Sequence, residues 1–410
     1  ASILMCSMLG GMRAVTWTQV AQYIVLIIAY LLPVFWISNN IGAGFFPHFM
    51  LADEVARIAE LEGQFGFVKN SAADLATVPK GLAGITKPHS SVNATPWAFI
   101  SLAVCMMAGT ASLPHVMMRY FTTPSVRTAR RSVGWSLFFI FLLYSSAPML
   151  ATLSKISLMD PNLATGIIGK SITEVQALDW YQNWNQAKLM FVSDFNGNGT
   201  LELNEFFMKG SAVVLATPEI AGLPYVISGL VAAGGMAAAM STADGLVLAI
   251  SNALSHDVYY KIINPKAETA KRLIVARVLL VLIGFAGATI AALEIQGILG
   301  SVIWAFDFAM SGLFFPLVLG VWWKRANAPG AVAGMLLGLI SGTAYLIWVR
   351  SGGSGFLGIT QLTFGIVGAA VSLVSMIVVS LITAAPDAAT QKMVDDVRVP
   401  SGKTILGKQH

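Results

Sequence analysis

Charged side chains are scarce in this sequence. Asp, Glu, Lys and Arg together supply 11% of its 410 residues, whereas an ordinary soluble domain carries about 25%. So few charges leave too little polar surface to cover a water-soluble globule of this length. The scarcity therefore excludes an ordinary soluble domain as the class of this chain.

Cysteines are rare and the common catalytic motifs are missing. Cys6 and Cys105 both lie inside apolar runs, so we interpret them as packing residues rather than a disulfide framework. The sequence has no phosphate-binding glycine loop, no zinc-ligand spacing and no nucleophile elbow. We therefore expect neither an enzyme nor a nucleic-acid partner. No basic segment with a cleavage site opens the chain at Ala1, so we expect a missing N-terminal portion rather than a signal peptide.

Apolar residues and glycine are abundant instead. Apolar residues make up 56% of the chain, glycine occurs 38 times and the mean hydropathy is +0.72. A membrane-spanning helix needs roughly 20 apolar residues, and lipid cannot satisfy an open strand edge. We therefore expect an all-α integral membrane protein with about eight full spans and one partial span. The expected spans are 1–10 (partial), 17–37, 97–118, 132–153, 223–250, 273–293, 298–323, 330–349 and 357–382.

Lys and Arg gather in alternate loops, which predicts an orientation because cytoplasmic loops carry an excess of these residues. The opposite loops are long and lean acidic, so we place 53–74 and 154–222 outside the cytoplasm and the tail 383–410 inside it. The alternative is that one apolar run is re-entrant, which would break the alternation. The basic loop residues are Arg13, Arg119, Arg127, Arg130, Arg131, Lys261, Lys266, Lys271, Arg272, Lys324 and Arg325.

The span 223–250 contains the polar residues that favour a cation site. Ser241 and Thr242 are adjacent hydroxyls, and Ala238 could offer its carbonyl one turn earlier. Sodium, like other hard cations, prefers oxygen ligands. The alternative is that both hydroxyls merely bond back to carbonyls of the preceding turn. Asp244 follows on the same helix, and an acid at membrane depth is a functional candidate by default, although it could be a structural partner of a neighbouring helix.

Asp307 is a second acid inside a predicted span. Either it lines the transport pathway together with Asp244, or it caps a break in its helix. Ser311 and Gly312 follow within about one turn, so a kink is expected there.

Three separate motifs resemble those of one transporter family. That family is the sodium:solute symporter family. Segment 10–18 resembles the glycine pair between its fourth and fifth core helices, and segment 109–122 resembles its sixth-helix motif. Segment 240–260 resembles its eighth core helix, so the three motifs occur in the order that the family has them. The cation/acetate symporters are the most similar members. The resemblance extends from about residue 10 to residue 323 and weakens beyond.

The resemblance implies a leucine-transporter-like fold of two inverted five-helix repeats, incomplete here at the N-terminus, with alternating access around a midplane site. It implies that Ala238, Ser241 and Thr242 form half of a sodium site, whose other half comes from the first core helix. One departure concerns Gln19, where many relatives carry an acid. The amide puts a second cation or proton route through that position in doubt.

We therefore expect a secondary active transporter in a bacterial inner membrane. It would couple sodium to the symport of a small organic solute, such as the monocarboxylate acetate, with the lipid bilayer and these ligands as partners and no obligate protein partner. The alternative is a transporter-like sensory protein that regulates a partner, because fold resemblance alone does not separate the two.

The loop from Asp194 to Glu205 matches the EF-hand calcium loop at every defined position. Leu201 stands at position eight, where such loops turn an apolar residue inward. We expect entering and exiting helices on either side, at 180–192 and from Phe206, within an inserted extracytoplasmic segment 177–210 of the transmembrane domain 1–382. The expected calcium ligands are Asp194, Asn196, Asn198, Thr200 (through its carbonyl), Glu202 and Glu205.

The alternative for this loop is a solvated Asn/Gly turn that binds no metal, because such residues are common turn formers. A turn alone does not require the acid Glu205 at position twelve. We therefore expect a structural calcium ion that braces the neighbouring spans, with the weak affinity of extracellular modules, roughly 0.1 to 1 mM.

Overall fold

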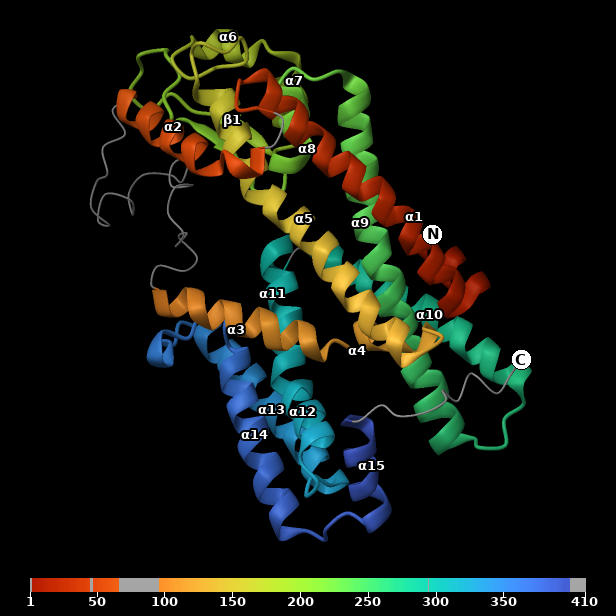
Figure 1. The fold of residues 1–410 in the computed structure, drawn as a ribbon. Coiled ribbons are helices and arrows are strands. Elements are labelled where there is room, and N and C mark those ends of the chain that lie inside the picture. The colour runs from red at the N-terminus through yellow and green to blue at the C-terminus, as the bar shows by residue number, and fades with distance from the viewer. Residues whose placement is uncertain (1, 45–46, 66–95, 294, 399–410) are drawn as a thin grey trace. The chain divides into compact units, whose positions relative to one another are not determined.

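The computed structural model describes residues 2–44, 47–65, 96–293 and 295–398 and is built mostly of helices (Figure 1). Seven of these helices are long and apolar enough to cross a membrane, and a pair bent by 48°, 97–112 with 114–120, raises the number to eight if it counts as one span. All eight predicted full spans have a counterpart among them. The seven are Ala14–Asn40, Val126–Met159, Tyr225–Ile263, Thr269–Ala292, Ile298–Trp322, Ala328–Arg350 and Gly365–Ile382.

The N-terminal helix differs from the prediction. Helix α1 runs without interruption from Ser2 to Asn40, so the expected partial span 1–10 is not separate from the next expected span, 17–37. A glycine pair weakens a helix but keeps its backbone donors, so it does not by itself end one. The last span also begins later than predicted, at Gly365, because a short 3-10 segment (Phe356–Gly358), in which Leu357 has a positive φ of 51°, and irregular turns precede it.

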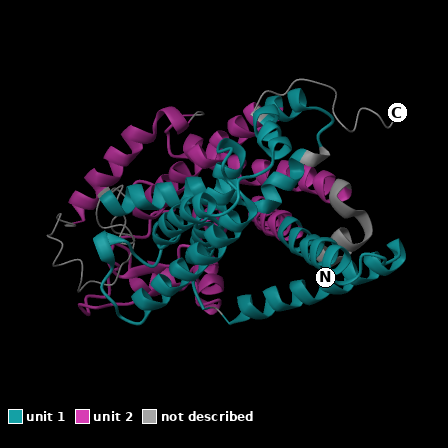
Figure 2. Cartoon of the chain, turned by 90° about the horizontal axis from the view of Figure 1, so that it is seen from below, with its two compact units in different colours: residues 1–12, 91–131, 245–410 teal, residues 13–90, 132–244 magenta. Residues whose placement is uncertain are grey.

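The chain divides into two compact units (Figure 2). One unit holds residues 1–12, 91–131 and 245–410, and the other holds residues 13–90 and 132–244. The chain passes from one unit to the other within α1, within α5 (Val126–Met159) and within α9 (Tyr225–Asn252).

In the second unit, α1, α5 and α9 share an apolar core. Val34 and Ile37 of α1 meet Met149 and Leu153 of α5 and Ile227 of α9, all of them buried. These residues recur every three or four positions on each helix, which places them on one helix face.

The same unit carries a small folded region, called here the cap, made of residues 51–65 and 160–222 (Figure 1). Its core also takes in the end of α5 and contains Tyr181, Met190, Leu201 and Phe206, all at most 4% exposed. Its first helix, α2 (Leu51–Gln64), is amphipathic, with Ile58 and Leu61 on its buried face. The cap elements are α2 (Leu51–Gln64), α6 (Ile172–Gln176), α7 (Asp179–Gln186), β1 (Met190–Val192), β2 (Phe206–Met208) and α8 (Val213–Ile220).

The first unit packs its helices through small residues. Helix α13 presents glycines every four positions, 330, 334, 338 and 342, to the serines and glycines of α14. Small residues at this spacing let membrane helices approach closely. Its elements are α3 (Pro96–Ser112), α4 (Pro114–Met117), a π-helical segment (Ala253–Ile263), α10 (Thr269–Ala292), α11 (Ile298–Ala309), a π-helical turn (Met310–Phe314), α12 (Phe315–Trp322), α13 (Ala328–Arg350), α14 (Gly365–Ile382) and α15 (Ala388–Arg398).

The π-helical turn Met310–Phe314 lies where the sequence predicts a kink. The C-terminal tail forms α15 up to Arg398, and the rest of the predicted tail lies outside the described residues.

Candidate functional site

Helix α9 brings two of the three predicted sodium ligands together. The Ser241 hydroxyl donates a hydrogen bond of 2.8 Å to the Ala238 carbonyl, so both oxygens lie on one helical turn. This is the back-bonding that the sequence offers as the alternative to a ligand role. The bond uses the hydroxyl proton and leaves lone pairs on both oxygens. The pair can therefore still face a cation. The third predicted ligand, Thr242, is exposed.

Gln19 of α1 reaches the same turn of α9. Its side chain is 7% exposed, and its amide nitrogen donates to the backbone carbonyl of Ser241. An ionised carboxylate at this position could only accept, so it could not make this bond. The departure from the family pattern at Gln19 therefore has a structural consequence, because the amide ties α1 to the candidate sodium turn.

Glycine permits the close approach of these two helices. A Cβ added to Gly234 would overlap the Cβ of Ala29 on α1. Gly234 lies about two turns before Ser241 on α9, so this contact holds the helices together near the candidate site. Asp244, three residues after Ser241, is only 1% exposed and belongs to the buried stripe of α9.

Asp307 lies in the other unit, on α11, and is fully buried. The Ser311 hydroxyl donates a 2.7 Å hydrogen bond to the backbone carbonyl of Asp307, just where the π-helical turn begins. Each unit therefore holds one of the two acids predicted at membrane depth. The expectation that both line a transport pathway stays a prediction.

The predicted calcium loop has the turn structure that its sequence favours. The Asp194 carboxylate accepts from the backbone amides of Gly197 and Gly199, at 2.7 and 3.0 Å. The Asn196 and Asn198 side-chain oxygens accept from the amides two residues on. Gly197 and Gly199 have positive φ angles of 71° and 70°, where a side chain would be strained.

The Glu205 carboxylate closes the loop from the inside. It is 0% exposed and accepts from the backbone amides of Phe195 (2.8 Å) and Glu202 (2.9 Å). Leu201, at position eight, is fully buried as predicted, and its backbone pairs with Gly169 and Lys170. These backbone hydrogen bonds attach the loop to the rest of the cap.

The flanks of this loop are strands rather than the predicted helices. The entering helix α7 ends at Gln186, Lys188 takes a positive φ of 56°, and β1 follows. Strand β1 pairs antiparallel with β2, with Phe191 opposite Phe207 and their rings stacked at 4.6 Å. A helix–loop–helix is therefore wrong here, and the loop closes a β-hairpin.

Carboxylates alone do not make this loop a metal site. Among the residues that the structure describes, no three His, Cys, Asp or Glu side chains gather as they do around a bound metal ion. The predicted ligand set depends on Asn side chains and a backbone carbonyl as well. Those oxygen types suit calcium, which accepts amide and carbonyl ligands readily.

Two ion pairs not expected from the sequence stabilise this region: one holds the cap to α5, and the other lies within the cap at the end of α5. The buried Lys155 ammonium binds the Glu62 carboxylate, and the Arg57 guanidinium binds the Asp160 carboxylate at 2.6 Å. Burial raises the pKa of the Asp160 carboxyl, but the Asn162 backbone amide and the Arg57 guanidinium lower it more, so this pKa lies below its usual range. The position of Lys155 within an apolar run could have indicated such a pair, because a charged side chain there needs a partner.

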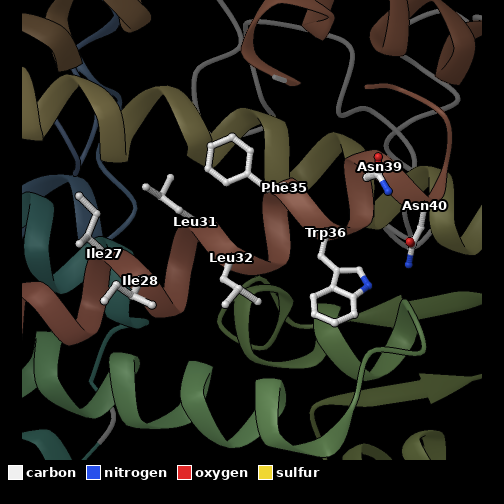
Figure 3. Close-up of a pocket in the computed structure, with 8 residues that line it drawn as sticks. All are labelled: Ile27, Ile28, Leu31, Leu32, Phe35, Trp36, Asn39 and Asn40. Atoms are coloured by element: carbon white, nitrogen blue, oxygen red, sulfur yellow. The ribbon is translucent and has the colours of Figure 1, made fainter. Parts of the chain in front are cut away.

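A groove of about 670 Å³ follows one face of α1 (Figure 3). Its lining is apolar apart from Asn39 and Asn40, so it offers no charged group that would hold a carboxylate solute. We therefore do not assign the solute site to it. The lining residues are Ile27, Ile28, Leu31, Leu32, Phe35, Trp36, Asn39 and Asn40.

Comparison with known families places the chain among membrane transporters. The sequence model of the sodium:solute symporter family matches residues 1–171 and 209–338. The interval between the two matched segments, 172–208, holds α6, α7 and the strand–loop segment up to Met208, and residues 339–410 also lie outside the match. The calcium-type loop therefore lies outside the part of the chain that follows the family pattern.

Two of the curated proteins that are similar in sequence bear on function. An uncharacterized symporter of Cupriavidus necator is 34% identical over 471 aligned residues, which cover 93% of this chain and 68% of the relative. A monocarboxylic acid transporter of Corynebacterium glutamicum is 26% identical over 341 residues, which cover 82% of this chain and 52% of the relative. The chain thus spans between about half and two thirds of their lengths.

A solved structure shares the fold. It shows the substrate-bound outward-open state of a sodium-coupled sialic acid symporter, and it matches with a TM-score of 0.58 at 16% identity. The match covers 94% of this chain and 66% of the other. The expected fold class, an all-α membrane protein of the leucine-transporter-like kind, is confirmed.

Proposed function

The chain belongs to the sodium:solute symporter family, and we propose that it forms part of a transporter that couples inward sodium movement to the symport of a small organic solute. A multi-pass membrane location follows from the family and from the seven apolar helices. The observation that carries the coupling proposal is the pairing of the Ala238 carbonyl with the Ser241 hydroxyl at 2.8 Å. Two hard oxygens on one turn of a membrane-spanning helix suit sodium.

The proposed solute class is a monocarboxylate. The similarity to a monocarboxylic acid transporter supports this choice. Within this class we propose acetate, because the sequence motifs resemble those of the cation/acetate symporters. Ala238, Ser241 and Thr242 would contribute their half of the sodium site, and Asp244 would lie beside the pathway on the same helix.

The experiment is uptake by the full-length protein in proteoliposomes, across a panel of labelled carboxylates. A sodium gradient should drive accumulation of at least one monocarboxylate, and an equal potassium gradient should not. Accumulation that is independent of sodium would overturn the coupling, while sodium-driven uptake of a different solute class would overturn only the choice of substrate. Binding of a solute without any transport would favour the sensory alternative.

We also propose that the hairpin loop Asp194–Glu205 binds a calcium ion through its predicted ligands. The asparagine turns and the two glycines with positive φ already give the loop the shape of a cation-binding turn. The ion would draw the Glu205 carboxylate and the Asp194 carboxylate together and so stiffen the hairpin that closes the cap. Its role would be structural, since the loop lies outside the family pattern.

The distribution of basic loop residues supports an orientation. We propose that the sides bearing Arg127 to Arg131 and Lys324 face the cytoplasm of a bacterium, which places the cap and its loop outside. Cysteine labelling from either side of intact cells, at positions in the cap and in α15, tests this arrangement.

A further inference from the structure

Asp307 is a buried acid with no role in the proposed sodium site. It is 0% exposed, and neither carboxylate oxygen has a hydrogen-bond partner among the described residues. The nearest donors are the Cys105 thiol and the backbone amides of Phe364 and Gly365, but none of them meets hydrogen-bond geometry. Such a group is expensive in an apolar protein interior and therefore needs an explanation.

No cationic side chain faces this carboxylate from the helices packed around it. Helix α3 contributes only Cys105 as an ionisable residue, and α14 and the π-helical turn contribute none. Helix α13 contributes Tyr345, whose hydroxyl bonds to the backbone of Phe356 and Ile359, and Arg350. The Arg350 guanidinium instead stacks at 5.0 Å over the ring of Trp304.

The packing holds the carboxyl group in place. A Cβ added to Gly109 of α3 would overlap the Phe306 carbonyl of α11, and one added to Gly365 of α14 would come within 2.9 Å of Asp307 Oδ1. Both helices therefore approach the Asp307 segment as closely as glycine allows. The carboxyl group points at the first residues of α14, an 18-residue helix.

Two opposing effects act on the charge of this group. Burial without a counter-ion disfavours the carboxylate. The N-terminus of α14 favours it, because backbone amides and the helix dipole stabilise a negative charge there. A sodium ion would need several oxygen ligands, whereas the nearest groups are a thiol and amide donors at the positive end of a helix. A proton needs only the carboxylate itself.

We propose that Asp307 is a proton-binding site inside the membrane domain. While α3, α11 and α14 enclose it, the carboxyl group carries a proton. When water reaches it, the O–H bond breaks, the proton passes to water, and the remaining carboxylate faces the amides that begin α14. The adjoining π-helical turn, with its irregular backbone hydrogen bonds, gives α11 a place to bend during this exchange.

Infrared spectroscopy of the full-length protein in lipid tests this proposal without requiring transport. The carboxyl C=O stretch of a protonated acid should be present at neutral pH, and Asp307→Asn should remove it. Asp395→Asn changes an exposed acid of the same unit, paired with Lys324, and should leave the band unchanged. Absence of any protonated carboxyl band in the wild type would overturn the proposal without recourse to a variant.

A second measurement separates proton binding from a purely structural role, in which Asp307 would only accept hydrogen bonds at the N-terminus of α14. Asparagine can still receive hydrogen bonds at the start of α14, so Asp307→Asn should keep the melting temperature close to that of the wild type. Its uptake rate should lose the pH dependence of the wild type. If Asp307→Asn melts at a lower temperature but keeps the infrared carboxyl band and the pH dependence of uptake, the role of Asp307 is purely structural, and the proposal is contradicted. Sodium coupling itself could fail while the infrared result stands, so the two proposals are tested separately.

Discussion

The side-chain amide of Gln19 donates a hydrogen bond to the backbone carbonyl of Ser241, across 222 residues of sequence. The bond joins α1 to the turn of α9 that holds the candidate sodium ligands. An ionised glutamate here could not donate this bond and would leave a buried carbonyl and an uncompensated charge, at a cost of about 1–3 kcal/mol or more, and burial would otherwise force it to take up a proton.

Gln19→Glu should therefore melt at a lower temperature than the wild type in sodium-free buffer. Sodium should restore part of the lost stability, because a cation between the carboxylate and the Ser241 carbonyl would satisfy both groups. Thermal unfolding in sodium chloride and in choline chloride measures this difference. Gln22→Glu, one turn further on α1, is the matched control and should gain no sodium dependence. Equal stability of Gln19→Glu in both salts would contradict the expected cation binding.

Ser241→Ala should weaken sodium binding without unfolding the protein. Loss of one oxygen ligand should weaken the binding free energy of sodium by about 1.4 kcal/mol. This loss corresponds to an about ten-fold higher sodium concentration at half-maximal uptake. Thr242→Ala should act in the same direction if its hydroxyl completes the site, and Ser228→Ala, on the same helix, should have no effect. The sodium dependence of uptake in proteoliposomes is the measurement. Unchanged sodium dependence in both variants would refute this ligand assignment.

The sequence predicted the spans well because hydropathy is a local property. It missed the late start of α14, since residues 357–364 are apolar enough for a helix but contain the positive φ angles of Leu357 and Gly358. It also placed a helix across Lys188, where the chain turns into β1. Both errors concern backbone geometry that apolar periodicity does not report.

The candidate site was predictable only in part. The hydroxyls of α9 stand next to each other in the sequence, so their shared turn could be expected. The Gln19 contact and the Lys155–Glu62 pair join segments that are far apart, and nothing local specifies such partners. The calcium loop shows the same division: its turns follow from local Asn and Gly residues, while its pairing with Gly169 and Lys170 depends on the folded cap.

Glu205→Gln should abolish the stabilisation of the cap by calcium. At a calcium concentration ten times the dissociation constant, binding adds about 1.4 kcal/mol to the stability of the wild type. The variant lacks one charged ligand and should show no such gain. Glu174→Gln, an exposed residue of α6, is the control and should respond to calcium like the wild type. Melting temperatures with calcium, magnesium or a chelator provide the comparison, and a calcium response retained by Glu205→Gln would argue against the site.

The Arg57–Asp160 pair should make the cap sensitive to acid. Because the pKa of Asp160 is lower in the folded protein than in the unfolded chain, its contribution to stability is fully present above the unfolded value of about 3.9. That contribution is lost as the pH falls through the lower, folded pKa, since the unfolded chain takes up the proton first. Wild-type stability should therefore decline below about pH 4.

Asp160→Asn removes the titrating group, so its stability should fall less steeply over the same acidic range. At pH 7 the variant should already be less stable by about 1–2 kcal/mol, less than the roughly 3–5 kcal/mol of a fully buried pair, because Arg57 is about one-third exposed (32%) and can be solvated once its partner is gone. Asp179→Asn, at the start of α7 and exposed, is the matched control on the same cap. Thermal unfolding between pH 3 and pH 7 distinguishes the two variants. Parallel pH profiles for wild type and Asp160→Asn would mean that the ion pair contributes no net stability to the cap.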